Sequence, residues 1–118
     1  MRHHSNKHTL GREKNQRLAL MRSLARSLII HEGITTTTAK AKALRPFIDR
    51  LVTTSKTNTL SSRKAVIEKL GGAHDAVKKL HDTIAPRFAQ RDGGYTRVIR
   101  LGKVGKQAAE SSRVEFVK

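Results

Sequence analysis

Arginine and lysine are the side chains of this sequence with the clearest chemistry, and that chemistry is the binding of phosphate groups. The chain has 118 residues, with 25 Lys plus Arg against 9 Asp plus Glu, so the formal net charge is 25 − 9 = +16. An arginine guanidinium can make two hydrogen bonds to one phosphate. Such an excess charge destabilises a compact chain by self-repulsion unless a polyanion neutralises it. Nucleic acid is the predicted partner, because neutralising its phosphates releases counterions.

The basic residues form four groups, and the first two lie near the N-terminus. Residues 1–12 are polar and lack periodicity, so they are predicted to form an extended arm that contacts RNA phosphates and stacks on bases. A solubilising tail is the alternative. The second group is Arg22 and Arg26, one helical turn apart, with Arg17 near the border of the same face; an ordinary solvated face is the alternative. No acid interleaves the arginine pair, which favours phosphate binding. The candidates in the arm are Arg2, His3, Lys7 and Arg12.

A threonine run followed by two lysines makes the third group. Lys40 and Lys42 fall near the start of a predicted helix, where free backbone N–H groups and the helix dipole favour an anion. The hydroxyls of Thr36 and Thr37 can donate to a phosphate or a ribose. A capped helix with exposed lysines accounts for the same residues equally well.

The fourth group surrounds a Gly-Gly pair. Gly93 and Gly94 would allow a backbone to approach RNA with no Cβ in the way, and Tyr95 could stack on a base or a sugar. A plain turn and an aromatic side chain at the edge of the core are the alternatives. The flanking basic candidates are Arg87, Arg91 and Arg97.

The sequence lacks the motifs that are typical of catalytic and metal sites. It has no cysteine, which excludes disulfides and cysteine zinc sites. It has no phosphate-binding loop of the P-loop or GxGxxG type, and "GKVGK" lacks the required spacing. Adjacent His–acid pairs such as His31-Glu32 rarely share a face. His3 could bind Cu(II) or Ni(II) with the terminal amine, but any third-place histidine can do so. We expect no catalytic residue, no metal site, no cofactor and no small-molecule substrate.

An anionic membrane surface is the rival to nucleic acid. No apolar run approaches the ~18 residues of a membrane span. The basic residues are spread along the whole chain and not concentrated in one amphipathic helix. The start, "MRHHSNKHTLGREK", lacks the apolar region of a signal peptide. We therefore expect no membrane partner and a protein that stays where it is made.

Hydrophobic periodicity predicts the elements that position these groups. Helices are expected over residues 13–30, 39–55, 61–70 and 73–85, and strands over 34–38, 93–101 and 113–117. Gly33 is expected to end the first helix, and the last threonine of the run, Thr38, to cap the second. Ser61 or Ser62 is expected to cap the third helix. Pro46 predicts a kink or a break in the second helix, and Pro86 is expected to end the fourth.

This order predicts an α+β fold of two layers. A helix, a strand, three helices and two strands would form a small mixed sheet packed against helices. Residues 13–118 would be one domain, including a basic loop at 102–112, and the arm at 1–12 would lie outside it. Apolar residues make up 36%, with three Phe, one Tyr and no Trp, so the core should be thin and mostly aliphatic. Its predicted members include Leu18, Met21, Leu24, Ala25, Leu28, Ile29, Ala43, Leu44, Phe47, Ile48, Leu51, Val77, Leu80 and Ile84.

Two sequence blocks resemble the bacterial large-subunit ribosomal protein bL17 family. The run "ITTTTAKAKALRPFIDRLVTTSK" is similar to the family signature I-x-T-T-x-x-K-A-K followed by an acid and an apolar-apolar-Thr step. The run "PRFAQRDGGYTR" is similar to the second block, P-R-F-A-x-R-x-G-G-Y-T-R. "MRH" at the start and the chain length also agree. The likeness covers nearly the whole chain.

The resemblance implies a structural protein of the large subunit near the exit of the nascent-chain tunnel. It implies binding to 23S rRNA and contact with neighbouring ribosomal proteins, a place on cytoplasmic ribosomes, no homo-oligomer and no catalytic role. A DNA-compacting architectural protein is the second hypothesis, and it predicts dimerisation and preference for duplex DNA. A membrane-surface protein is the third, and it requires an exposed amphipathic helix.

Overall fold

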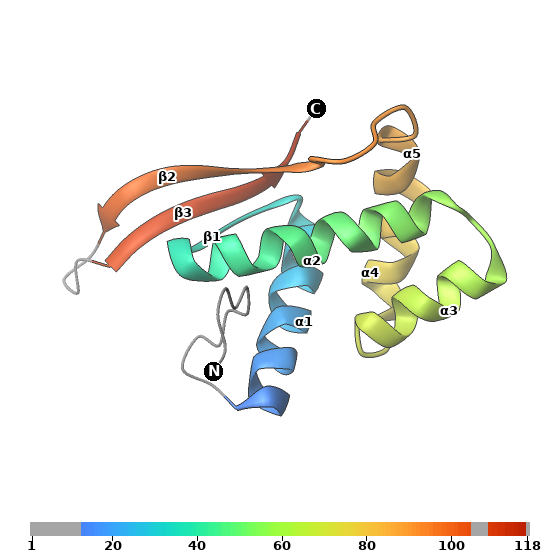
Figure 1. Cartoon of the computed structure of the whole chain (residues 1–118), viewed down its shortest axis with the longest axis horizontal. Helices are drawn as coiled ribbons and strands as arrows, with labels where there is room; N and C mark the ends of the chain where they lie inside the picture. The colour runs from blue at the N-terminus through green and yellow to red at the C-terminus, as the bar shows by residue number, and fades with distance from the viewer. Residues whose placement is uncertain (1–12, 105–108, 118) are drawn as a thin grey trace, which may run out of the picture.

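The computed structural model describes residues 13–104 and 109–117, and the chain there folds as helices packed against a small sheet (Figure 1). The expected α+β class is confirmed. Figure 1 shows α2 crossing the middle of the molecule, with β2 and β3 above it and α1 descending below it. The elements are α1 (Lys14–His31), β1 (Gly33–Thr37), α2 (Thr38–Lys56), α3 (Leu60–Lys69), α4 (His74–Lys79), a π-helical turn η1 (Leu80–Ile84), α5 (Ala85–Arg87), β2 (Thr96–Val104) and β3 (Ala109–Phe116).

The sheet has three strands in the order β1-β3-β2. Both pairings are antiparallel, so the expectation of a mixed sheet is wrong. The last strand enters between the first two, and the central row of the sheet pairs Ile34 with Val114 and Val114 with Val98. This row faces the helices, because Val114 is fully buried. The outer strands β1 and β2 each leave one edge unpaired within this sheet.

The β2–β3 hairpin is longer than the sequence suggested. β2 runs to Val104 and β3 begins at Ala109, so much of the predicted loop at 102–112 is strand. The register shifts between Arg100 and Gly102, where Gly102 adopts φ +83°. Such a bulge lets one strand carry an extra residue without ending the pairing. Residues 105–108 of the predicted loop and the predicted arm at 1–12 lie outside the described residues.

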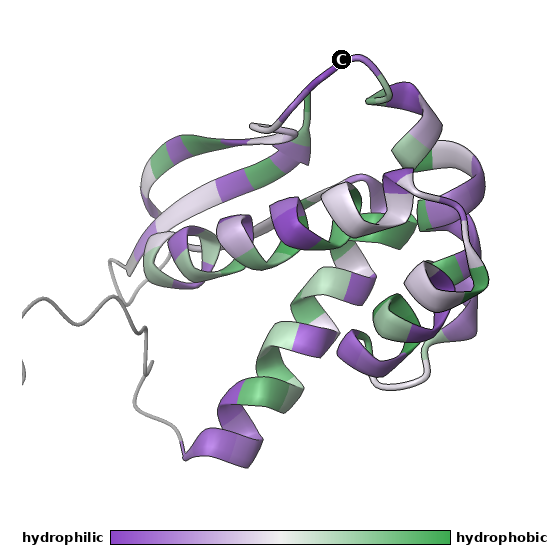
Figure 2. Cartoon of the chain, turned by 45° about the vertical axis from the view of Figure 1, so that its right-hand side comes forward, coloured by the Kyte–Doolittle hydropathy of each residue, from purple (hydrophilic) through white to green (hydrophobic). Residues whose placement is uncertain are grey.

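Helix α2 is the centre of the packing. Its buried positions recur at three- and four-residue steps, which gives one apolar side and one solvent side. Helical turns alternate between hydrophilic and hydrophobic colour in Figure 2, as amphipathic helices do. The helix runs unbroken through Pro46, so of the kink or break expected there, the break is wrong. Pro46 is exposed, and the carbonyl that loses its helical donor can therefore bind water. The buried α2 residues are Thr38, Ala41, Leu44, Ile48, Leu51, Val52 and Ser55.

One apolar core joins the end of α1, α2, the α4–η1–α5 segment and the sheet. The first half of α1 contributes less than predicted: Leu18 is 38% exposed, and burial begins at Ala25. The core also holds an aromatic group in which the Phe88 ring lies 5.2 Å from that of Tyr95 and 6.1 Å from that of Phe116. The expected burial of Val77, Leu80 and Ile84 is confirmed.

The helix ends differ from the predictions in detail. Glu32, with φ +63°, takes the left-handed position at the end of α1 that we had assigned to the following glycine. Thr37 caps α2 in place of Thr38, whose hydroxyl instead lies 2.7 Å from that of Ser112 in the core. Thr59 caps α3 in place of either serine.

The fourth helix also runs further than predicted. It passes through the π turn η1 and ends at Arg87, one residue beyond Pro86, which lies in the first turn of α5. The first turn of a helix is where a missing N–H is tolerated.

Candidate nucleic-acid interface

The two α1 arginines that we expected to face phosphate join α1 to the α3–α4 segment. The Arg26 guanidinium donates to both carboxylate oxygens of Asp75, at 3.3 and 2.6 Å. Arg22 donates from Nε to the Lys69 carbonyl at 3.3 Å and from Nη2 to the Glu68 carbonyl at 3.2 Å. Asp75, the acid that pairs with Arg26, lies 49 residues away in the sequence, so the residues around the arginine pair did not indicate it. The hydrogen bonding between Arg26 and Asp75 raises the pKa of Arg26 and lowers the pKa of Asp75.

The remaining candidates near the N-terminus contribute little to the described surface. Arg17 lies in the first turn of α1 and is half-buried. The other four lie outside the described residues; they are Arg2, His3, Lys7 and Arg12.

The threonine–lysine group divides into structural and free side chains. The Thr37 hydroxyl accepts from the Lys40 backbone N–H at 3.4 Å, so it caps the helix. Thr36 is half-buried in β1. The side chains of Lys40 and Lys42 have no hydrogen-bond or ion-pair partner among residues 13–104 and 109–117. These lysines are therefore available to an external anion.

The Gly-Gly segment is held against the end of α2. Arg91 Nε donates to the carbonyls of Gly93 and Gly94, at 3.1 and 3.2 Å. Lys56 Nζ donates to the Arg91 carbonyl and, at 3.2 Å, to Tyr95 Oη. Gly94 adopts φ +60°, a conformation that favours glycine. The arginine thus fixes the turn, and sequence reasoning missed the lysine that anchors it.

Tyr95 is fully buried, so the prediction that it stacks on a base or sugar is wrong. Its ring packs against Phe88, and its hydroxyl lies 3.1 Å from that of Thr53. The alternative, an aromatic side chain of the core, is the correct one. Its neighbours are Phe88, which directly follows α5, and Thr53 and Lys56 of α2, 42 and 39 residues away in the sequence.

Arg87 and Arg97 make ion pairs at the protein surface. Arg87 Nη1 donates to Glu32 Oε1 at 2.6 Å, and Lys79 Nζ lies 3.3 Å from the other oxygen of that carboxylate. The hydrogen bond from Arg87 is the main cause that lowers the pKa of Glu32. Arg97 Nη2 lies 3.6 Å from Glu115 Oε2 across the hairpin. Both arginine side chains remain partly exposed.

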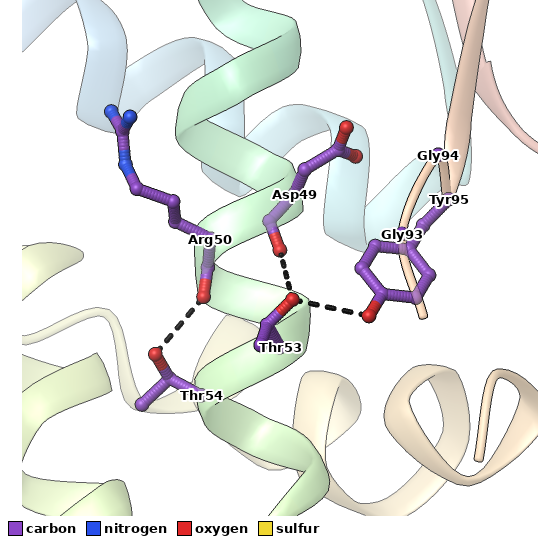
Figure 3. Close-up of a pocket in the computed structure, with 7 residues that line it drawn as sticks. All are labelled: Asp49, Arg50, Thr53, Thr54, Gly93, Gly94 and Tyr95. Carbon is purple, nitrogen blue, oxygen red and sulfur yellow. Dashed lines mark hydrogen bonds between the residues drawn. The ribbon is translucent and has the colours of Figure 1, made fainter. Parts of the chain in front are cut away.

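Helix α2 carries cationic groups that the sequence analysis did not select. Arg45 and Arg50 are exposed on α2. The Arg50 guanidinium has no hydrogen-bond or ion-pair partner within the described part of the chain, and Figure 3 shows it extended away from the helix. The sequence could have indicated this exposure, because Arg50 follows the buried Ile48 by two residues and so lies on the opposite side of the helix.

A pocket of about 380 Å³ lies between α2 and the Gly-Gly segment (Figure 3). Asp49 and Thr53 line it from α2, and Gly93 and Gly94 line it from the other side. The Asp49 carboxylate is half-buried and accepts from the Thr96 hydroxyl at 3.2 Å. Burial raises the pKa of Asp49, against the opposing effects of its hydrogen bonds and of nearby Arg45. The pocket is lined by both Asp49 and the unpaired Arg50.

The described acids neutralise only part of the positive charge. Seven ion pairs involve seven different basic side chains, and all of them lie at least partly in solvent. No group of three or more metal-ligating side chains occurs within the described residues. None of the described helices is long and apolar enough to cross a membrane. The fold and the surface define a small basic α+β protein whose unpaired basic side chains can bind an anionic partner.

The sequence comparisons identify the family. The profile of ribosomal protein L17 matches residues 20–117, and the chain belongs to this family. A protein of Hydrogenobaculum sp. named large ribosomal subunit protein bL17 is 46% identical over 118 residues, covering 99% of each chain. Proteins of the same name are 45% identical in Thermomicrobium roseum, with 99% of each chain covered, and 48% identical in Thermodesulfovibrio yellowstonii, with 99% of this chain and 87% of the relative covered. The resemblance found in the two sequence blocks is confirmed.

Proposed function

We propose that this chain is a structural constituent of the large ribosomal subunit that binds 23S rRNA near the polypeptide exit tunnel and supports translation. Family membership supports this proposal, because the relatives are named large ribosomal subunit proteins. The net charge of +16 supports a polyanionic partner. The protein works without catalysis, as a single copy on cytoplasmic ribosomes, beside other proteins of the subunit.

The observation that carries rRNA binding is the set of free cations on α2. Lys40, Lys42 and Arg50 have no partner in the described part of the chain, although many other basic side chains do. They share one helix, with Arg50 on its solvent side and Lys40 and Lys42 on the two flanks of its buried side. Cations on a rigid scaffold can bind phosphates without the entropy loss of ordering a loop. Arg87, Arg91, Arg97, Arg22 and Arg26 mainly hold the fold that presents this surface.

The first test compares two sets of substitutions with equal charge changes. Replacing Lys40, Lys42 and Arg50 with glutamine should lower the affinity for 23S rRNA. Each lost phosphate contact should also reduce the slope of log affinity against log salt by about 1. Filter binding of the full chain over a range of salt concentrations measures both quantities.

The matched control moves the same loss of charge to other helices. Lys64, Lys69 and Lys78 lie on α3 and α4, and their side chains also lack partners in the part of the chain that the structure describes. Glutamine at these positions should change the salt slope less than the α2 substitutions do. Equal effects of the two sets would mean that net charge, and not the α2 surface, sets the affinity.

The cellular assignment is tested by sedimentation. The protein should travel with the large subunit in a sucrose gradient and remain there after a high-salt wash. Cross-linking on those subunits should join it to rRNA and to proteins around the tunnel exit. Sedimentation with DNA, or a dimer in solution, would instead support the architectural DNA-binding hypothesis.

A further inference from the structure

The pocket between α2 and the Gly-Gly segment has mostly apolar walls, with Arg50 at its edge and the Asp49 carboxylate as its acidic group. Thr53 Oγ1 donates to the Asp49 carbonyl at 3.0 Å, and Thr54 Oγ1 donates to the Arg50 carbonyl at 3.0 Å. Each hydroxyl hydrogen is thereby occupied, and the oxygen keeps a lone pair. Figure 3 shows both bonds along α2, with the Asp49 carboxylate pointing toward the glycine side. A group that binds beside the Asp49 carboxylate and the two threonine oxygens must therefore supply hydrogen-bond donors.

Asp49 differs from the acids that make the ion pairs of this protein. No lysine or arginine nitrogen lies within 4.0 Å of its carboxylate in the described chain. Its recorded donors are the Thr96 hydroxyl and the Tyr95 backbone N–H. A carboxylate has about four lone-pair sites, so two donors leave acceptor capacity open. These two bonds fix the carboxylate in place.

The glycine side of the pocket leaves space that the fold does not use. A Cβ built on Gly93 would meet no heavy atom within 4 Å, and Gly93 has no positive φ. Folding therefore does not require glycine at this position, whereas Gly94 adopts φ +60°. Gly93 and Asp49 line the same pocket from opposite sides (Figure 3).

We propose that this pocket binds an unpaired guanine of RNA by its Watson–Crick edge. Guanine presents N1–H and N2–H₂ as adjacent donors, and a carboxylate can accept from both. Cytosine and adenine present one amino group beside an acceptor, and uracil presents one N–H between two acceptors. A phosphate would be repelled by Asp49, but the phosphate attached to the bound guanosine can reach Arg50 at the pocket edge. The proposal rests on the proposed function, because it presumes that the partner is RNA.

The test uses kethoxal, which reacts with N1 and N2 of unpaired guanine. Wild-type protein bound to 23S rRNA should protect at least one guanine that is reactive in the free RNA. Asp49→Asn keeps an oxygen for Thr96 but places an amino group where a carboxylate oxygen was. Protection of that guanine should disappear, and rRNA affinity should fall by ~10-fold, within the range of one bidentate base contact.

Two further variants make the result specific. Gly93→Ala should also abolish protection, because its methyl group enters the free space while the fold is retained. Asp92→Asn makes the same charge change at an exposed neighbour that does not line the pocket, and it should preserve protection. Both asparagine variants raise the net charge, so nonspecific attraction to RNA cannot explain a loss of binding in one of them.

The outcomes separate the two proposals. If no variant and no wild-type protein binds rRNA, the proposed function fails. If rRNA binds with wild-type affinity in all variants and no guanine depends on Asp49 for protection, the guanine site is refuted. Cross-linking of the pocket to an arginine of a neighbouring protein in the intact subunit would equally refute it.

Discussion

His81 should make the stability of this protein depend on pH in a range where few other groups titrate. The side chain lies in the π turn η1 and is 4% exposed. By distance and angle, neither ring nitrogen makes a hydrogen bond with another described residue, although the Ser55 backbone lies close enough to affect the pKa of the ring. Burial is the main cause that lowers the pKa of His81 below its usual 6.5, and Arg63 lowers it further, against smaller opposing effects of the Ser55 backbone and Asp82. At pH 7 the folded protein therefore holds the His81 ring in the neutral form.

The sign of the pH effect follows from this lowered pKa. Above pH 6.5 the ring is neutral in both states, and the stability is fully present. As the pH falls below that value, the unfolded chain takes up a proton that the folded chain refuses. The free energy of unfolding should then decrease by up to about 1.4 kcal/mol per pH unit until the pKa of the folded state is reached.

Substitution of His81 by leucine should remove both the pH slope and the two unsatisfied nitrogens. An unsatisfied buried polar group costs about 1–3 kcal/mol, so His81→Leu should raise the free energy of unfolding by about 1–3 kcal/mol at pH 7. Urea denaturation of the full chain, followed by circular dichroism between pH 5 and pH 7.5, measures both changes. Salt at a fixed, moderate concentration limits the self-repulsion of the charged chain.

The matched control is His74→Leu, because His74 is exposed at the start of α4. It removes an exposed ring and no buried nitrogen, so it should leave the free energy of unfolding at pH 7 within about 0.5 kcal/mol of wild type. The reasoning is refuted if wild type and His81→Leu lose stability equally between pH 5 and pH 7.

Four further substitutions test the turn and helix geometry and the acid stability by urea denaturation. Pro46→Ala should stabilise the protein by about 1–3 kcal/mol, because it restores a helical donor on an exposed side of α2; a loss of stability would mean that the proline has a packing role. Gly94→Ala should destabilise by about 1–2 kcal/mol because of its φ of +60°, whereas Gly93→Ala should stay within about 0.5 kcal/mol; similar effects would contradict the assigned turn geometry. Glu32→Gln should reduce the loss of stability below pH 4.5, because Arg87 and Lys79 lower the pKa of Glu32 and its contribution vanishes as it is protonated; an unchanged acid limb would refute this.

Local patterns predicted the helices well. The second helix was expected at residues 39–55 and runs from Thr38 to Lys56, and the first differs by one residue at each end. Repeated apolar positions lie within the segments themselves, so a single sequence is enough to find the helices, although the capping residues were each predicted one to three positions away. The start of β3 was missed because "AESS" has little β propensity, and pairing with β2 holds it extended.

Long-range partners explain most errors at the candidate site. Arg26 finds Asp75, and Tyr95 is buried with its hydroxyl beside Thr53, across sequence separations of 49 and 42 residues. A basic or aromatic residue looks free in the sequence until the fold supplies its partner. Lys40 and Lys42 are selected candidates whose side chains have no hydrogen-bond or ion-pair partner among residues 13–104 and 109–117.

The unpaired edge of β2 has a consequence for the protein before it reaches its partner. An open strand edge is a template for another strand, and Ile99 and Leu101 on β2 are 40% and 47% exposed. Arg97, Arg100 and Lys103 alternate with these apolar residues along the same strand. Arg97 and Arg100 lie near Glu115 and Glu110 of β3, whereas Lys103 has no ion pair in the described chain. We expect the excess positive charge at this edge to disfavour pairing between two newly made copies. Salt that screens these charges weakens that protection, and a bound polyanion makes it unnecessary.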